Sequence, residues 1–255
     1  DYLYFDGDIV MARIAPERQF GKRVAMPVDV LSRQHTTVTG LYRHRAGMGY
    51  IDVALKSFRV DVMVAPDGVH AEDGQYVVAD IIQYPSVKQG YCVARVTQVL
   101  GDTATPGIEL AVALSAHAIP HTWPDAVYDA VAALPDDAHD DDPRRVDLTA
   151  LPFVTIDGED SRDFDDAVYA KCLPSGGYCL YVAIADVSYY VTPDSALDQV
   201  AQERGTSVYF PREVVPMLPE ALSNHLCSLV PKQKRLALVA KIQFNADGVV
   251  HSYDF

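Results

Sequence analysis

Cysteine is scarce in this chain, and so are the features that would place it in a membrane or outside the cell. The 255 residues include four cysteines and no CxxC pair, so free thiols in a reducing cytoplasm are favoured over disulfides or a zinc site. No apolar run approaches the roughly 20 residues that a membrane helix needs. Residues 1–4 lack the basic-then-apolar pattern of a signal peptide. We therefore expect a cytoplasmic protein without a membrane partner.

Positive charge is also in short supply, and it is unevenly spread. The chain holds 21 Lys/Arg against 35 Asp/Glu, for a net charge of −14. Residues 11–59 nevertheless hold nine Lys/Arg and only three acids, whereas residues 125–166 hold fourteen acids and three arginines. This contrast is compatible with a protein that binds a polyanion at the basic region and cuts it at the acidic one. A solvated basic face is the alternative.

The acidic region is densest in residues 155–168, between the apolar runs 151–156 and 167–173. Six acidic residues stand here within ten positions, among them Asp157, Asp163, Asp165 and Asp166. Their mutual repulsion costs stability unless cations lie among them. Oxygen ligands suit hard divalent ions, Mg²⁺ first and Mn²⁺ as a possibility, and such ions polarise phosphoryl oxygens and activate water. This segment is the predicted site of chemistry.

The first hundred residues have the pattern of β structure. Short runs rich in Val, Ile and Tyr alternate with turn signals such as Pro66-Asp67-Gly68. Five or six such strands within about 65 residues predict a small closed barrel of the OB type, a fold that commonly binds single strands. The expected strands are 24–31, 36–42, 49–55, 59–65, 75–84 and 91–100.

Helical patterns follow the barrel. Thr105 and Pro106 are expected to cap and begin a helix that runs to about residue 118. A second helix opens at Thr122 and Pro124, with Val127, Val131 and Leu134 on one face. The polar stretch 136–145 is the expected domain boundary; its Asp/His run could bind a metal, but a solvated linker is favoured.

Strand-like alternation returns after residue 146. A hairpin of 167–173 with 178–187, a helix from Thr192 to Gly205 and a strand over 235–244 are expected, followed by a turn and one more short strand. The predicted fold class is therefore a β-barrel of the OB or cold-shock type followed by an α+β domain.

Several separated motifs stand in the second half of the chain. They are 155–168, Val182-Ala183-Ile184-Ala185-Asp186-Val187-Ser188, 204–211, Val215-Pro216-Met217-Leu218-Pro219 and 222–229. Together they resemble the ribonuclease II/ribonuclease R family of exoribonucleases, and the ribonuclease R branch most closely. The front half resembles that family's cold-shock modules, with residues 7–10 near the end of a first module and 36–102 as a second.

The resemblance implies a processive, hydrolytic 3′-to-5′ exoribonuclease that degrades single-stranded RNA to nucleoside 5′-monophosphates. The family's metal-binding carboxylates match Asp157, Asp163, Asp165 and Asp166, the last two of which are the expected catalytic pair. Adjacent side chains diverge on an extended backbone, so an irregular loop is expected at that pair.

Three further residues near these motifs are given roles. Tyr209 matches the aromatic residue that stacks on the 3′-terminal nucleotide; from its apolar neighbours alone, a core position would be favoured. Phe164 is expected to anchor the loop by packing. Arg162 is expected to offset carboxylate repulsion, with a phosphate contact as the alternative.

The chain departs from the family in two respects. Lys234 stands where the family has aspartate, which reverses a charge near the core, and the family's later arginine, its later acidic residues and its S1 domain are not in these residues. We expect a truncated catalytic domain, and an RNA-binding module with a degenerate nuclease domain is the alternative function. The expected domains are 1–30, the tail of a first cold-shock module; 31–104, a second; 105–146, a helical connector; and 147–255, the first part of the catalytic domain.

Overall fold

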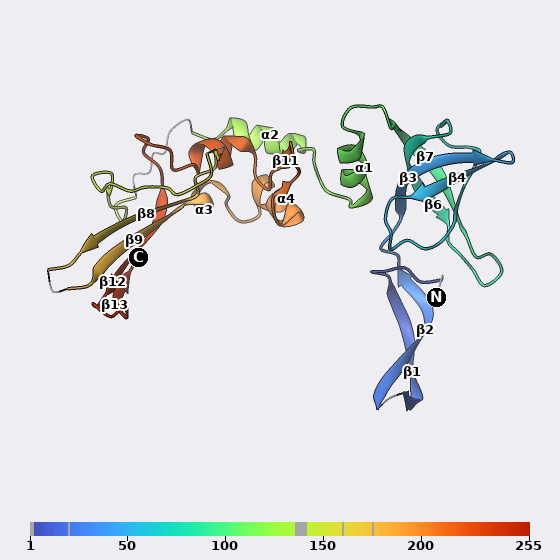
Figure 1. The fold of residues 1–255 in the computed structure, drawn as a ribbon, viewed down its shortest axis with the longest axis horizontal. Coiled ribbons are helices and arrows are strands. Elements are labelled where there is room, and N and C mark those ends of the chain that lie inside the picture. Colours follow the sequence, from blue (N-terminus) through green and yellow to red (C-terminus); the bar gives the residue numbers. More distant parts are fainter. Residues whose placement is uncertain (1–2, 20, 136–141, 160, 175) are drawn as a thin grey trace. The chain divides into compact units, whose positions relative to one another are not determined.

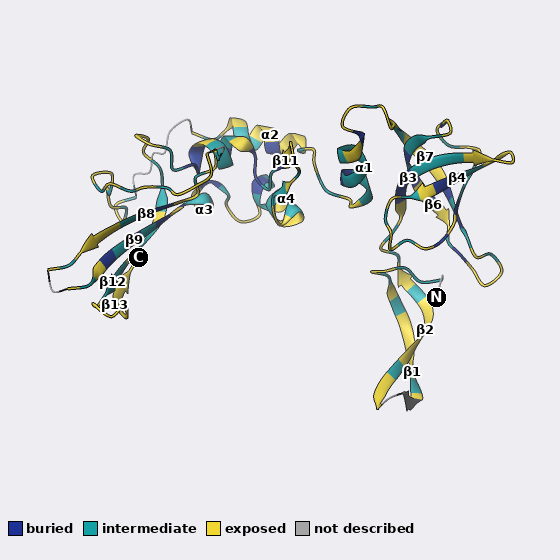
Figure 2. Ribbon diagram, in the orientation of Figure 1, coloured by how far each residue is buried: buried dark blue, intermediate teal, exposed yellow. Residues whose placement is uncertain are grey.

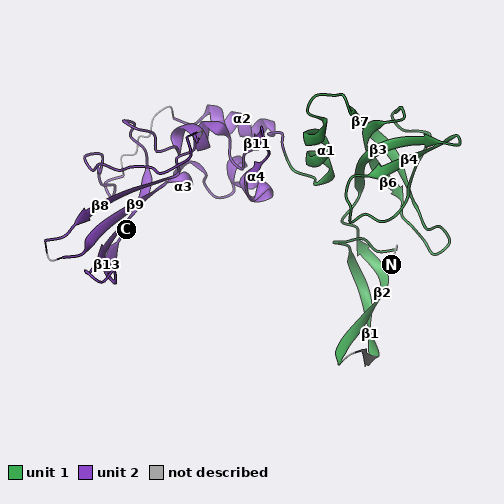
Figure 3. Cartoon of the chain, in the orientation of Figure 1, with its two compact units in different colours: residues 1–120 green, residues 121–255 purple. Residues whose placement is uncertain are grey.

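The computed structural model describes residues 3–19, 21–135, 142–159, 161–174 and 176–255. The chain divides into two units, residues 1–120 and residues 121–255, which Figure 3 colours separately. Figure 1 labels the elements of both units. Within the described ranges, no helix is long and apolar enough to span a membrane.

A closed five-stranded barrel forms the core of the first unit. The strands are hydrogen-bonded in the order β3-β4-β5-β7-β6, and every pair is antiparallel except β5 with β7. Side chains alternate across each strand, so Val38, Val62 and Val77 fill the interior. The predicted OB-type barrel is confirmed. Its strands are β3 (Thr37–Arg45), β4 (Met48–Val53), β5 (Val62–Val64), β6 (Gln75–Gln83) and β7 (Cys92–Asp102).

A two-stranded antiparallel ribbon precedes the barrel, formed by β1 (Ile9–Gln19) and β2 (Lys22–Ser32). The sequence analysis predicted only the second of these strands. Pro16 lies in β1, and a proline inside a run argues against a strand because it has no N–H for the ladder. The structure accommodates it where the pairing register shifts, between Ile14 and Arg18. Much of the ribbon is exposed (Figure 2).

A buried ion pair ties the segment before the ribbon to the barrel. The side chain of Asp8 is 1% exposed and accepts hydrogen bonds from Arg33 Nη1 at 2.7 Å and from the Phe5 amide at 2.9 Å. The same guanidinium lies 4.5 Å from the ring centre of Tyr84 in the barrel wall. Burial alone would raise the pKa of Asp8, but the amides of Phe5 and Gln34 and the Arg33 guanidinium together lower it.

The first helix, α1 (Ile108–Ala116), packs on the barrel through buried Ile108 and Leu114. A side-chain hydrogen bond of 2.7 Å joins its Ser115 to Thr39 of β3. The predicted helix is confirmed, but its predicted cap is wrong. Gly107, with φ of 78°, precedes the first turn, and this left-handed conformation favours glycine.

The second unit contains a four-stranded antiparallel sheet in the order β13-β12-β9-β8. The predicted β8–β9 hairpin and the predicted strand β12 are confirmed. The helix expected from Thr192 begins later, where the Ser195 hydroxyl accepts a hydrogen bond from the Asp198 amide. The sheet strands are β8 (Asp166–Cys172), β9 (Tyr178–Ala185), β12 (Ala237–Phe244) and β13 (Val250–Asp254). The other elements are α2 (Asp125–Ala132), α3 (Val187–Tyr190), α4 (Ala196–Arg204), β10 (Val208–Tyr209), β11 (Val214–Val215) and the π-helix η1 (Ala221–Leu226).

The helices of the second unit share one apolar core. Val127 of α2 is 1% exposed and packs in the same cluster as Leu197 of α4 and Leu222 of η1. The two units therefore divide between Pro120 and His121, earlier than the boundary expected within residues 136–145. Of that stretch, 136–141 and its possible metal ligands lie outside the described residues. The four cysteines are free thiols in this structure.

The buried Asp8–Arg33 pair generates a pH prediction. Because the pKa of Asp8 is lowered on folding, its stabilisation is present above the ordinary aspartate pKa near 4 and is lost as the pH falls through the lowered value. Asp8→Asn should lower the stability of the barrel by about 2 kcal/mol at pH 7, and this loss should shrink below about pH 4. The loss of stability is measured by urea unfolding, with hydrogen exchange of the β6 amides as the signal. Asp6→Asn is the exposed control; an equal loss from Asp8→Asn at pH 7 and at the acid limit would contradict the assignment.

Candidate functional site

The four predicted aspartates lie on residues 157–166, called here the acidic segment. Asp157 and Asp163 lie in backbone without helix or strand, while Asp166 begins β8. All four side chains are exposed. Residue 160 lies outside the described residues. The sequence therefore placed the carboxylates correctly on a loop that enters the sheet.

Asp165 lies in backbone without helix or strand, as expected of a loop, and Asp166 is the first residue of strand β8. The Asp165 carbonyl accepts a hydrogen bond of 2.9 Å from the Ala185 amide, and Asp166 pairs with Ile184. The β8–β9 ladder thus fixes the backbone at the end of the acidic segment.

The predicted metal ligands in the acidic segment are all carboxylate oxygens. Among these four side chains the structure gives one hydrogen bond, from the Ser161 hydroxyl to Asp163 at 3.2 Å, and the described residues give them no ion pair. Oxygen ligands of this kind fit Mg²⁺ or Mn²⁺. Across the described part of the chain, however, no three His, Cys, Asp or Glu side chains are grouped closely enough to hold a metal ion. The metal ligands therefore stay a prediction, which the donor chemistry fits.

A buried serine holds the acidic segment from a distant part of the chain. Ser228 is 0% exposed. Its hydroxyl donates to the Arg162 carbonyl at 2.8 Å and accepts from the Phe164 amide at 3.1 Å, while the Leu229 amide donates to the Phe164 carbonyl at 2.7 Å. We call these three hydrogen bonds the Ser228 clamp. Phe164 was expected to anchor the loop through its side chain, but its backbone makes these bonds.

The segment that carries Ser228 is itself held by Arg235. Arg235 Nε donates to the carbonyl oxygens of His225 and Ser228, both at 3.0 Å, at the end of the π-helix η1. Single π-helical turns are rare and often mark functional sites. Cys227 lies in the same stretch, and burial raises the pKa of its thiol to about 11, so the thiol is neutral at pH 7.

The reversed charge at Lys234 is on the surface, not near the core as expected from the sequence. Its side chain is 74% exposed and faces Asp147 at 3.5 Å, itself 63% exposed. Exposed pairs of this kind contribute little to stability. Lys234 therefore leaves the Arg235 contacts intact.

Asp186 is a half-buried carboxylate that the sequence analysis named only as part of a motif. It follows Ala185, the partner of Asp165. Burial alone would raise its pKa, but hydrogen bonds of 2.8 Å from Arg145 Nη2 and from the Ser188 hydroxyl lower it. Asp186 thus stays ionised and joins the chain before the acidic segment to the end of β9.

Tyr209 is exposed, so the core position favoured by its neighbours is wrong. It lies on β10, opposite Val214 of β11, and its side chain is 69% exposed. The connection after this short hairpin is tied down by Arg204 Nη1, which donates to the Pro216 carbonyl at 2.8 Å. The ring is available for stacking; its contact with a nucleotide stays a prediction.

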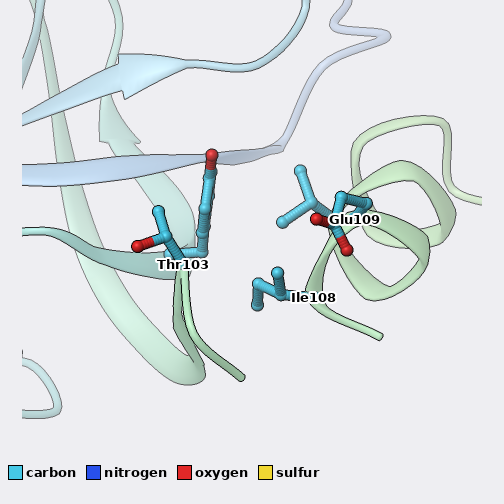
Figure 4. A pocket seen from close by; sticks show the side chains of 5 residues that line it. Thr103, Ile108 and Glu109 are labelled. Carbon is cyan, nitrogen blue, oxygen red and sulfur yellow. The ribbon is translucent and has the colours of Figure 1, made fainter. Parts of the chain in front are cut away.

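A shallow pocket of about 270 Å³ lies in the first unit, between the barrel and α1 (Figure 4). Tyr76, Thr103, Ile108, Glu109 and Val112 line it. It is smaller than a typical ligand site and offers one carboxylate. The chemistry expected of the chain therefore rests on the acidic segment.

Two family models match the chain. One describes an RNB domain and covers residues 145–255; the other describes a cold shock domain and covers residues 50–124. The acidic segment, Tyr209 and Ser228 all lie in the RNB match, and most of the barrel lies in the cold shock match.

Relatives and solved structures agree with these matches. Ribonuclease R of Escherichia coli is 43% identical over 251 residues, covering 98% of this chain and 31% of its own length. Ribonuclease R of Thermotoga maritima is 41% identical over 231 residues, covering 89% of this chain and 32% of its own length. The apo form of Mycoplasma genitalium RNase R covers 99% of this chain and 40% of its own, with a TM-score of 0.85 and 33% identity. The same enzyme in complex with ribose-methylated single-stranded RNA also has a TM-score of 0.85, with 32% identity.

These comparisons confirm the resemblance predicted from the motifs and the predicted succession of an OB-type barrel and an RNB domain. The chain spans about a third of the length of the curated relatives it matches.

The position of Arg235 generates a stability prediction. Arg235→Met keeps the apolar stem but leaves the two carbonyl oxygens without their charged donor, so the second unit should lose about 2 kcal/mol of stability. Urea unfolding followed by the fluorescence of Trp123, the single tryptophan, reports on this unit because Trp123 packs against its core. Exposed Arg212→Met is the matched control. Equal unfolding curves for the two variants would contradict the role of Arg235.

Proposed function

We propose that this relative of ribonuclease R, which combines a cold shock domain with an RNB domain, acts as a 3′-to-5′ exoribonuclease on single-stranded RNA. The observation that supports this most strongly is the 43% identity to ribonuclease R across 98% of the chain. Within the RNB match, the acidic segment exposes four aspartates. In the proposed reaction, processive hydrolysis releases nucleoside 5′-monophosphates. The four free cysteines fit action in a reducing cytoplasm.

The acidic segment supplies the groups that phosphodiester hydrolysis needs. Two divalent ions, Mg²⁺ or Mn²⁺, would polarise the phosphoryl oxygens and activate water when bound there. Asp157, Asp163, Asp165 and Asp166 are the proposed ligands, with Asp165 and Asp166 nearest the chemistry. The Ser228 clamp and the β8–β9 ladder hold the backbone of this segment at two points, so part of the ordering is complete before an ion arrives.

Tyr209 is the proposed contact for the 3′-terminal nucleotide. A base stacked on an aromatic ring gains roughly 1 to 3 kcal/mol, and every base has a face that can stack. An exposed tyrosine on a tied-down hairpin therefore suits an enzyme that removes nucleotides of any sequence.

The first unit is the proposed RNA-binding part. Of its basic residues between 11 and 59, two are tied to acids: Arg33 to Asp8, and Arg43 to Asp52 at 3.2 Å. Basic side chains that remain exposed can neutralise phosphates. They are Arg13, Lys22, Arg23, Arg45, Lys56 and Arg59.

One observation favours a second candidate function, an RNA-binding module whose nuclease half is degenerate. The described residues contain no ready group of three metal ligands. Such a module would bind RNA through its first unit and leave the strand intact. The two candidate functions therefore differ in whether the bound RNA is cleaved.

Incubation of the chain with 5′-labelled single-stranded RNA and Mg²⁺, with and without EDTA, separates the two functions. The proposed exoribonuclease converts full-length RNA directly to very short products, and EDTA stops the conversion. RNA that is retarded in a gel but remains uncut would contradict nuclease activity in this chain and support the binding module.

Replacement of a proposed ligand should separate cleavage from binding. Asp165→Asn removes negative charge from the acidic segment and leaves the barrel untouched, so the cleavage rate should fall by at least about 100-fold while RNA affinity in EDTA is unchanged. The control is Asp247→Asn, in the exposed β12–β13 turn. A parallel loss of cleavage and affinity would show that Asp165 acts on folding or binding instead.

Removal of the exposed ring should change how far degradation proceeds. Tyr209→Ala should lengthen the smallest product because the last nucleotides are no longer held by stacking, whereas Tyr209→Trp keeps an aromatic face and should preserve the original product. Denaturing gels of end-labelled RNA give the product lengths. An unchanged product in Tyr209→Ala would remove this side chain from the RNA path.

A further inference from the structure

The hydroxyl of Ser228 brackets one of the proposed metal ligands. Its two hydrogen bonds end on the carbonyl of Arg162 and the amide of Phe164, the residues on either side of Asp163. The third bond of the clamp, from the Leu229 amide to the Phe164 carbonyl, lies next to Asp165. The clamp therefore acts on the backbone between two proposed ligands.

The clamp is mounted on a part of the fold that does not belong to the acidic segment. Ser228 is 64 residues away from Phe164 in sequence, and its own carbonyl is held by Arg235 at 3.0 Å. Arg235 lies just before β12, which pairs with β9, and β9 pairs with β8 at Asp166. The acidic segment is thus fixed at one end by the sheet ladder and in its middle by a side chain supported by the same sheet.

Packing alone does not account for a serine at this position. A fully buried position that only needed a small side chain would accept alanine without the cost of burying a hydroxyl. Here the hydroxyl uses both its donor and its acceptor capacity on the acidic segment. Without it, the Arg162 carbonyl and the Phe164 amide would have to find other partners.

The charges on the acidic segment make such a clamp useful. Its carboxylates repel each other, and the repulsion favours opening of the backbone when no cation is present. Hydrogen bonds that hold residues 162–164 oppose this opening. A cation then binds a segment that is already partly ordered, and the affinity is higher because less ordering remains to be done.

We propose that Ser228 is a positioning residue, which sets the affinity of the acidic segment for divalent cations by fixing the backbone around Asp163. This inference rests on the proposed function, because it takes the acidic segment as the metal site. The cation is of the Mg²⁺ and Mn²⁺ class, and Ser228 acts on it through the backbone of residues 162–164 without touching it.

Mn²⁺ binding to the 255-residue chain, followed by electron paramagnetic resonance, tests the inference without depending on catalysis. Ser228→Ala should weaken Mn²⁺ binding by about fivefold or more, since the cation must now supply the lost ordering. It should also speed the exchange of the Phe164 amide. Ser195→Ala is the matched control: it removes another serine hydrogen bond, the helix cap to Asp198 at 3.2 Å, at a site outside the acidic segment. That variant should melt at a lower temperature than the wild type and keep its Mn²⁺ affinity.

The other results of these measurements also test the positioning role of Ser228. Equal Mn²⁺ affinity in the wild type and Ser228→Ala would overturn the positioning role, and so would an equal loss in Ser195→Ala, because the effect would then reflect stability alone. If Ser228→Ala does not fold, Ser228→Cys replaces it: the thiol is a weaker donor and acceptor, and the same loss of affinity is expected. Equal affinity in the wild type and Asp165→Asn would overturn the metal site of the proposed function, and the inference with it.

Discussion

The hydrogen bonds between the buried hydroxyl of Ser228 and the backbone of residues 162 and 164 constrain the part of the molecule on which the chemistry depends. A loop with several carboxylates tends to open because like charges repel. In this chain the sheet holds the loop at Asp165 and Asp166, and Ser228 holds the backbone of residues 162 and 164 directly before them. The core formed by α2, α4 and η1 places Ser228 where it can reach the loop, so the packing of the helices and the position of the carboxylates are coupled.

The two units expose different charged groups, and each is assigned a different part of the proposed task. The first unit exposes most of its basic side chains, whereas its Asp8–Arg33 pair stabilises the fold. The second unit exposes the four predicted metal ligands, and its partly buried pair Asp186–Arg145 at 2.8 Å serves the same structural purpose. In both units the ionic groups that stabilise the fold are paired and partly or fully shielded from solvent, whereas those assigned to RNA or metal are exposed.

Local patterns predicted the elements, and they failed where a contact between distant residues decides the outcome. The barrel strands and the β8–β9 hairpin follow from alternation and turn residues, which are visible within a few positions. β1 was missed because it contains Pro16, which fits there only through a register shift that the sequence does not show. The cap of α1 was missed because it depends on the backbone conformation of Gly107. Ser228 gave only the signal of lying in a family-like motif, because its partners are more than 60 residues away. The carboxylates were located by composition alone, yet the strand that begins at Asp166 depends on pairing with β9.

The most direct test of this account is the amide exchange of Phe164 and Leu229 in the metal-free protein, measured by nuclear magnetic resonance. If Ser228 orders the acidic segment before any cation binds, both amides should exchange at least about 100-fold more slowly than an unstructured peptide. Exchange as fast as that of the exposed residues 157–159 would contradict the account, because the segment would then be ordered, if at all, by the cation.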